Sequence, residues 1–177
     1  SVGLIKEGRL ALAKGYGLAN RETKLIPTGD TVWSMASCSK PVVGIAALKL
    51  VDQGKLDLDK DVSDYIGFPL RNPNFPDDKI TMRHLLAHAS SLKDASQADI
   101  SSYPRPDPPQ QLEKDVRTWL LPEGAEFANA AYWDASAKPG AKYAYANVGS
   151  TVAGLVVEKA AGQLFNEFCN QHLFAPM

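Results

Sequence analysis

The stretch WSMASCSKPVVGIAALKLV, residues 33–51, places Ser37 three residues before Lys40 and then continues as an apolar segment. Proline disrupts the interior of a helix, but the first four N–H groups of a helix have no partner within it. Pro41 therefore predicts a helix that begins at Cys38, with Ser37 as its N-cap. Residues three apart on a helix are neighbours, so we expect the Lys40 amine beside the Ser37 hydroxyl at a positive helix N-terminus. That arrangement suits a nucleophile.

The rest of this segment predicts a buried helix that ends at Gly54. Its expected core face consists of Val42, Ile45, Ala46, Leu48 and Val51. A plainer interpretation is also open, because serine is a common N-cap and a lysine in a first helical turn is usually solvated. A second Ser-x-x-Lys pair, Ser90 and Lys93, lies in a polar stretch with no apolar helix behind it.

Composition is ordinary for a globular protein, with 45% hydrophobic and 22% charged residues in 177. A net charge of −1 without a basic cluster argues against nucleic acid as a partner. No apolar run approaches the roughly 20 residues that span a bilayer. No basic stretch followed by an apolar one opens the chain, so we expect any signal peptide to be absent or already removed. The two cysteines, Cys38 and Cys169, do not make a disulfide framework.

The order of elements predicts an α+β fold. Residues 4–18 read as a hairpin of short strands around a turn at Lys6-Glu7-Gly8, and the remainder is mostly helical. Thr81 is an expected N-cap, and helices are expected within 113–121 and 163–177. Between them, Val152, Leu155 and Val156 predict one face of a further helix that Gly162 ends. The proline-rich stretch at 103–109 reads as an exposed loop or an insertion.

His84 and His88 stand four apart on an expected helix, a spacing that can bind zinc. The metalloprotease pattern requires Glu after the first His, and Leu85 occupies that position. We therefore favour structural roles for both histidines and expect no metal and no organic cofactor.

Four motifs together resemble the serine β-lactamase and penicillin-recognising superfamily, in the branch of class C β-lactamases, family VIII carboxylesterases and DD-peptidases. They are ASCSK (36–40), KLVDQGKLDLDKDVSDYI (49–66), ITMRHLLAHASSL (80–92) and PGAKYAYAN (139–147). Their shared order is far more specific than any one of them. The resemblance implies a two-lobed β-lactamase/transpeptidase-like domain, with 1–32 as a sheet hairpin and 33–177 as a mostly helical lobe. It also favours a periplasmic or secreted location.

Carried over by position, the resemblance makes Ser37 the acylated nucleophile and Lys40 the lysine that helps to deprotonate it. Tyr145 matches the tyrosine that shuttles the proton, and Asn147 matches a binder of the substrate amide. This chemistry is sensible in itself, because a serine hydroxyl needs an adjacent base and a tyrosine can take a proton and later return it. The Ser37 N–H, at a helix start, is a candidate for half of an oxyanion hole.

Three departures from the family pattern stand out. Ser90-Ser91 replaces the usual Ser-Gly, the proline-rich stretch alters one wall of the expected cleft, and the Lys-Thr-Gly motif is absent from these 177 residues. A lone hairpin is marginal in water, so we expect further sheet strands from a C-terminal segment or a partner chain.

The sequence thus predicts a serine hydrolase that forms an acyl-enzyme with β-lactams, carboxylic esters or D-amino-acid peptides. Its catalytic set is Ser37, Lys40 and Tyr145, with Asn147 binding substrate. The alternatives are a non-catalytic binding or scaffold protein of the same fold, and a fragment that is inactive without its C-terminal part.

Overall fold

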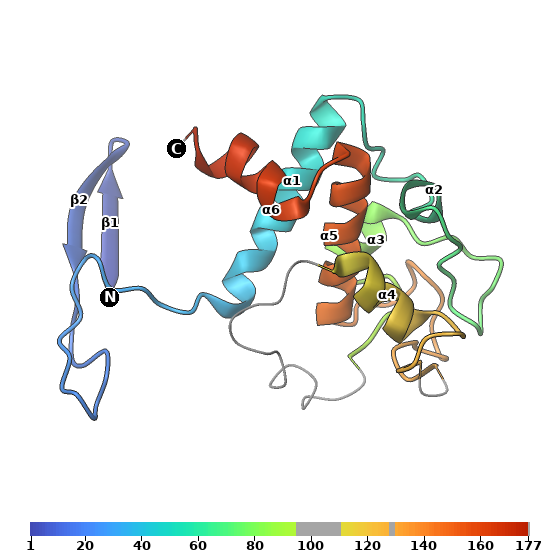
Figure 1. Cartoon of the computed structure of the whole chain (residues 1–177), viewed down its shortest axis with the longest axis horizontal. Coiled ribbons are helices and arrows are strands. Elements are labelled where there is room, and N and C mark those ends of the chain that lie inside the picture. Colours follow the sequence, from blue (N-terminus) through green and yellow to red (C-terminus); the bar gives the residue numbers. More distant parts are fainter. Residues whose placement is uncertain (95–110, 128–129, 177) are drawn as a thin grey trace. The chain divides into compact units, whose positions relative to one another are not determined.

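A computed structural model describes residues 1–94, 111–127 and 130–176 (Figure 1). The chain divides into two compact units, Ser1–Cys38 and Ser39–Met177. The first holds a two-stranded sheet and the second is helical. The predicted proline-rich loop at 103–109 lies outside the described residues.

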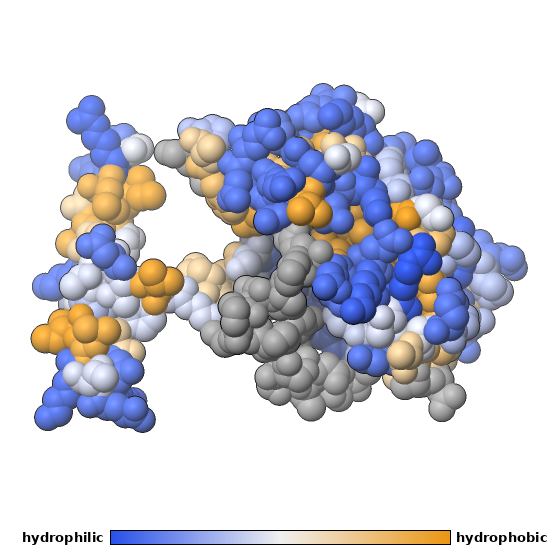
Figure 2. Space-filling model, viewed as in Figure 1, coloured by the Kyte–Doolittle hydropathy of each residue, from blue (hydrophilic) through white to orange (hydrophobic). Residues whose placement is uncertain are grey.

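The N-terminal unit contains the expected hairpin. Strands β1 (Val2–Lys6) and β2 (Arg9–Lys14) pair antiparallel, with an irregularity in register after Leu4. Glu7 and Gly8 both take positive φ, 52° and 73°, which is the pattern of the type I′ turns that suit the twist of two-residue hairpins. Every residue of both strands is exposed, and apolar side chains lie along the hairpin surface (Figure 2).

Helix α1 (Lys40–Asp52) begins two residues later than predicted. Ser39, not Ser37, is its N-cap, and Lys40 is its first residue. The preceding residues form the short 3₁₀ turn η1 (Ala36–Ser39), which Ala36 enters with a φ of 45°. Tighter turns of this kind are frequent at helix starts, and Pro41 still lies in the first turn, where its missing N–H costs no bond.

The predicted core face of α1 is partly wrong. Ala46, Ala47 and Leu50 are fully buried, whereas Ile45 and Leu48 are 55% and 50% exposed. The small alanine side chains belong to the buried core of the helical unit, in which α1 packs against α5. Because the helix is apolar on more than one side, its sequence alone does not choose which side faces the core.

The helical unit is built around α5 (Asn147–Ala161), whose buried residues extend from Val148 to Val157 (Figure 1). Contacts to it come from α1, α2 (Ser63–Ile66), α3 (Met82–Leu86), α4 (Leu112–Leu120) and α6 (Phe165–Cys169). The π-helical turn η4 (Asn170–Phe174) follows α6. Gly162 ends α5 in the left-handed conformation, as predicted. Within the described ranges, none of the helices has the length and apolar character to cross a membrane.

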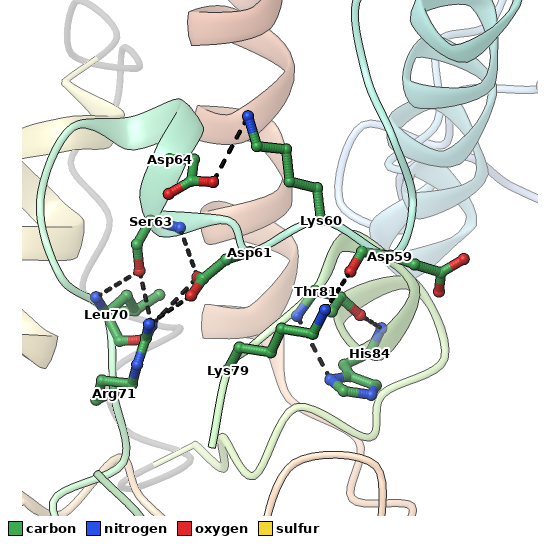
Figure 3. Close-up of polar contacts among 10 residues, drawn as sticks. All are labelled: Asp59, Lys60, Asp61, Ser63, Asp64, Leu70, Arg71, Lys79, Thr81 and His84. Carbon is green, nitrogen blue, oxygen red and sulfur yellow. Dashed lines mark hydrogen bonds and ion pairs between the residues drawn. The ribbon is translucent and has the colours of Figure 1, made fainter. Parts of the chain in front are cut away.

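A polar network fixes the loop that surrounds α2 (Figure 3). Arg71 donates to the Asp61 carboxylate and to Ser63 Oγ, and Asp61 accepts the Ser63 N–H at 3.0 Å. Burial works to raise the pKa of Asp61, but the hydrogen bonds from Arg71 and Ser63 outweigh it and leave the pKa below its usual value. The loop therefore has an internal anchor.

Helix α3 starts with the predicted N-cap (Figure 3). Thr81 Oγ1 accepts the His84 N–H at 3.2 Å, while His84 Nδ1 accepts the Thr81 N–H at 3.4 Å. The two residues form a reciprocal capping box. The His84 ring is thus used in capping, and α3 is held in the position from which His88 reaches the site described below.

Candidate active site

Ser37 lies in η1, in the last turn of the N-terminal unit, two residues before the helical unit begins. The residue before it, Ala36, has a φ of 45°, and the Cys38 N–H bonds to the Met35 carbonyl at 3.0 Å. A non-glycine residue with positive φ beside a candidate nucleophile is the kind of backbone strain found at functional sites. Its place beside Lys40 remains a prediction from spacing.

Three of the predicted residues come together in the helical unit. Lys40 Nζ donates to Oδ1 of Asn147 at 2.6 Å. The same nitrogen lies 4.8 Å from the centroid of the Tyr145 ring. Lys40 opens α1, while Tyr145 lies two residues before Asn147, the first residue of α5. The beginnings of the two helices thus place an amine, a phenol and an amide together.

Asp94 is part of this cluster, although sequence reasoning did not select it. Its Oδ1 accepts the backbone N–H groups of Asn147 and Val148 at 2.8 and 3.1 Å, and its Oδ2 accepts Asn147 Nδ2 at 2.8 Å. The N-cap residue of α5, Ala146, has no side-chain acceptor, so the carboxylate from a distant loop supplies the cap. The sequence does show that no capping residue precedes this long helix, which indicates that an acceptor from elsewhere in the chain must cap it.

His88 lies against the candidate proton-transfer tyrosine. Its ring centroid is 4.5 Å from that of Tyr145, and its Nδ1 accepts the Ala146 N–H at 3.3 Å. Burial lowers the pKa of His88, the Lys40 charge lowers it further, and Asp94 opposes the shift. His88 itself has a φ of 52°, and its carbonyl accepts the Ala144 N–H at 2.7 Å. It therefore holds the segment before α5 through both backbone and ring.

Among the described residues, no group of three or more potential metal ligands is gathered in one place. His84 and His88 bond to different partners, Thr81 and Ala146.

A cleft of about 290 Å³ adjoins the cluster between α1, α3 and α5. Lys40 and His88 are its basic residues, and Ser150 adds a hydroxyl. Apolar side chains line much of the remainder, among them Val43, Leu48 and Leu86. Lys40 belongs both to this cleft and to the cluster with Tyr145 and Asn147.

The loop that departs from the family pattern keeps a left-handed conformation without glycine. Ser91 has a φ of 65° and is 4% exposed. Its Oγ donates to the Ala137 carbonyl and accepts Asn72 Nδ2 at 2.6 Å. Hydrogen bonds of the hydroxyl thus offset the strain that glycine would avoid.

A family model described as Beta-lactamase matches residues 1–177. The chain belongs to the beta-lactamase family. Its fold is accordingly that of β-lactamases and penicillin-binding proteins, and the sequence resemblance to this superfamily is confirmed.

Relatives within the family carry different names. The chain is 27% identical to "Protein flp" of Staphylococcus aureus strain MW2 over 177 residues, which is 100% of this chain and 33% of the relative. It is 32% identical to "Esterase EstB" of Burkholderia gladioli over 162 residues, covering 89% of this chain and 40% of the esterase. The chain therefore spans about a third of the length of the curated relatives it matches.

Solved structures agree with this assignment. The octameric penicillin-binding protein homologue from Pyrococcus abyssi is 27% identical, with a TM-score of 0.68 over 98% of this chain and 37% of that one. EstCE1, a hydrolase with promiscuous acyltransferase activity, is 28% identical, with a TM-score of 0.69 over 96% of this chain and 44% of that one. Both matches cover nearly all of this chain and less than half of the other.

Proposed function

We propose that the protein containing this chain is a serine hydrolase that works through an acyl-enzyme on Ser37. The observation that carries the proposal is the 2.6 Å contact between Lys40 Nζ and Asn147 Oδ1, made beside the Tyr145 ring. A solvated surface lysine does not require a hydrogen bond to a side-chain amide or an adjacent aromatic ring. A lysine that accepts and returns a proton must be held in place by such contacts. Family membership supports the proposal, and the relatives include a named esterase.

The proposed reaction has two halves. Ser37 Oγ attacks the carbonyl carbon of the substrate while its proton passes to the Lys40–Tyr145 pair, and collapse of the tetrahedral adduct expels the leaving group, which takes that proton. Water then attacks the Ser37 ester and gives up a proton to the same pair, which releases the acid and restores the hydroxyl. Lys40 and Tyr145 thus act as base and acid in turn.

Asn147 has two roles in this proposal. Its amide has two lone pairs and two N–H groups, and the contacts with Lys40 and Asp94 use one of each. The second N–H and the second lone pair are left for a substrate amide or ester. Asn147 therefore holds the lysine and can contact substrate at the same time.

Among the three substrate classes, we favour carboxylic esters over β-lactams. Aryl esters have good leaving groups, and the apolar lining of the cleft suits a short acyl chain. The direct test compares hydrolysis of p-nitrophenyl butyrate with that of a chromogenic cephalosporin by the full-length protein, using Ser37→Ala as the control. Faster cleavage of the cephalosporin would reverse the preference between substrates.

A non-catalytic binding protein of the same fold is the second candidate. The same assay separates the two functions when a labelled penicillin is added to it. A binding protein would retain the penicillin and would hydrolyse neither substrate.

A further inference from the structure

The Asn147 side chain is held at both ends, and the two contacts demand opposite chemistry. Oδ1 accepts from Lys40 Nζ at 2.6 Å, whereas Nδ2 donates to Asp94 Oδ2 at 2.8 Å. A lysine ammonium can only donate and a carboxylate can only accept. The amide therefore satisfies both neighbours in one orientation alone, because a flipped amide would face donor to donor and acceptor to acceptor.

We propose that Asp94 is the positioning residue that turns the acceptor end of Asn147 toward Lys40. The inference rests on the proposed function, since it concerns how the proposed base is held. It also extends that function, because Asp94 is 53 residues from Asn147 and belongs to none of the motifs that identified the site. Asp94 influences Lys40 through the Asn147 side chain, so it is a positioning residue and not itself a catalytic one.

The Asp94 carboxylate combines two functions that can be separated. Oδ1 caps α5 by accepting the N–H groups of Asn147 and Val148, at 2.8 and 3.1 Å. Oδ2 meets the Asn147 amide and sets its orientation. An asparagine at position 94 would keep the cap, since Asn and Asp cap helices about equally well. The side-chain N–H group of the new asparagine would, however, face Asn147 Nδ2, which is also a donor, so the two could not form a hydrogen bond.

This separation defines the experiment. Asp94→Asn and Asp94→Ala are made in the full-length protein, and two quantities are measured: the thermal midpoint and the rate at which a fluorophosphonate labels Ser37. For Asp94→Asn we expect a nearly unchanged midpoint and labelling that is slower by about ten- to a hundredfold, the penalty of a misplaced catalytic group. For Asp94→Ala we expect both quantities to fall.

Asp61→Asn is the matched control. Asp61 also accepts a backbone N–H beside a helix start, from Ser63 at 3.0 Å, and it also pairs with another side chain, Arg71. It lies in the loop just before α2, where its partners are Ser63 and Arg71 (Figure 3). The same chemical change there is expected to lower the midpoint and leave the Ser37 labelling rate unaltered.

A reciprocal exchange provides a rescue. In the double variant Asp94→Asn with Asn147→Asp, the new amide can cap α5 and donate to the new carboxylate, whose other oxygen accepts from Lys40. Labelling is therefore expected to recover part of the rate lost in Asp94→Asn. Labelling of Asp94→Asn at the wild-type rate would overturn the inference.

Failure of the inference is distinguishable from failure of the proposed function. A double-mutant cycle of Asp94→Ala and Asn147→Ala, read by denaturant unfolding, reports the bond between the two side chains without any catalysis. Additive shifts in the midpoint would overturn the role of Asp94. If the wild-type protein is not labelled at Ser37 but the cycle gives non-additive shifts, only the proposed hydrolase is overturned. The pairing of Asp94 with Asn147 then stands.

Discussion

Lys40 Nζ lies 2.6 Å from Asn147 Oδ1, although 107 residues separate the two in sequence. The contact joins the first residue of α1 to the first residue of α5, and the Tyr145 ring lies beside it. Burial of the α1–α5 packing surface brings these helix starts together. The hydrophobic core thus positions the proposed base.

Lys40 and Tyr145 are expected to act as one proton-transfer unit, so their losses should not add. Lys40→Ala and Tyr145→Phe are each predicted to reduce kcat by at least about a hundredfold, the usual range for general acid–base groups. The double variant should be little worse than the worse single one. Steady-state ester hydrolysis by the four proteins measures this directly.

Lys159→Ala is the control for that series. Lys159 pairs with Glu113 at 2.6 Å at the other end of α5, so its removal changes charge without touching the cluster. Its kcat is expected to match that of the wild type. Strictly additive losses for Lys40 and Tyr145 would argue against a shared proton path.

Ser91 is predicted to tolerate glycine better than alanine. Both substitutions remove the hydroxyl that bonds Asn72 and the Ala137 carbonyl, at a cost of about 1–3 kcal/mol. Glycine also removes the strain of a φ of 65°, worth roughly 1–2 kcal/mol, which alanine retains. Denaturant unfolding should therefore rank the wild type first, Ser91→Gly second and Ser91→Ala last; the reverse order of the two variants would show that strain is not stored there.

The free energy of unfolding is expected to fall as the pH is lowered, and His88 is expected to account for part of that fall. Burial and the Lys40 charge hold the pKa of His88 below its ordinary value of 6.5, despite the opposing Asp94. Below about pH 6.5 the unfolded chain binds a proton that the folded protein resists, so unfolding becomes easier as pH falls toward the folded-state pKa. At higher pH the histidine is neutral in both states and this effect vanishes.

The variant His88→Asn measures that contribution, because asparagine tolerates the positive φ at this position. It should flatten the decline of the unfolding midpoint as the pH falls below about 6.5. His84 is a second contributor, since burial lowers its pKa as well. An unchanged slope in His88→Asn would rule out the role assigned to His88.

The hairpin is expected to pair with strands outside these 177 residues. Leu4 and Ile5 are 53% and 72% exposed in β1, and Leu10 is 68% exposed in β2. Two strands alone leave unpaired edges and an uncovered apolar surface. Residues 1–177 expressed by themselves should therefore self-associate and show no esterase activity.

Leu10→Lys should improve the solubility of the 177-residue chain and destabilise the full-length protein, where the side chain is expected to be covered. Sedimentation and thermal unfolding measure the two effects. A monodisperse 177-residue monomer with full activity would show that the sheet needs no further strands.

Much of the architecture was predictable because it depends on local chemistry. The Glu7-Gly8 turn, the Thr81 cap and the stop of α5 at Gly162 each follow from one or two residues. The core face of α1 was not predictable, since a helix apolar on several sides does not reveal which side its neighbours cover. Ile45 and Leu48 are exposed for that reason.

The site divides in the same way. Motif order selected Lys40, Tyr145 and Asn147, and the fold brings these three together. Asp94 escaped selection because its role depends on a loop reaching a helix start that lies 53 residues further along the chain. Tertiary contacts of that kind leave no periodic or spaced pattern in a single sequence.

The central claim is that Ser37 is the acylated residue, and peptide mass spectrometry after fluorophosphonate treatment tests it most directly. The full-length protein should carry one adduct, on the peptide containing Ser37, and Lys40→Ala should slow its formation. Ser90, the first residue of the other Ser-x-x-Lys pair, is 3% exposed and should stay unmodified. An adduct on Ser90, or none on Ser37, would contradict the account.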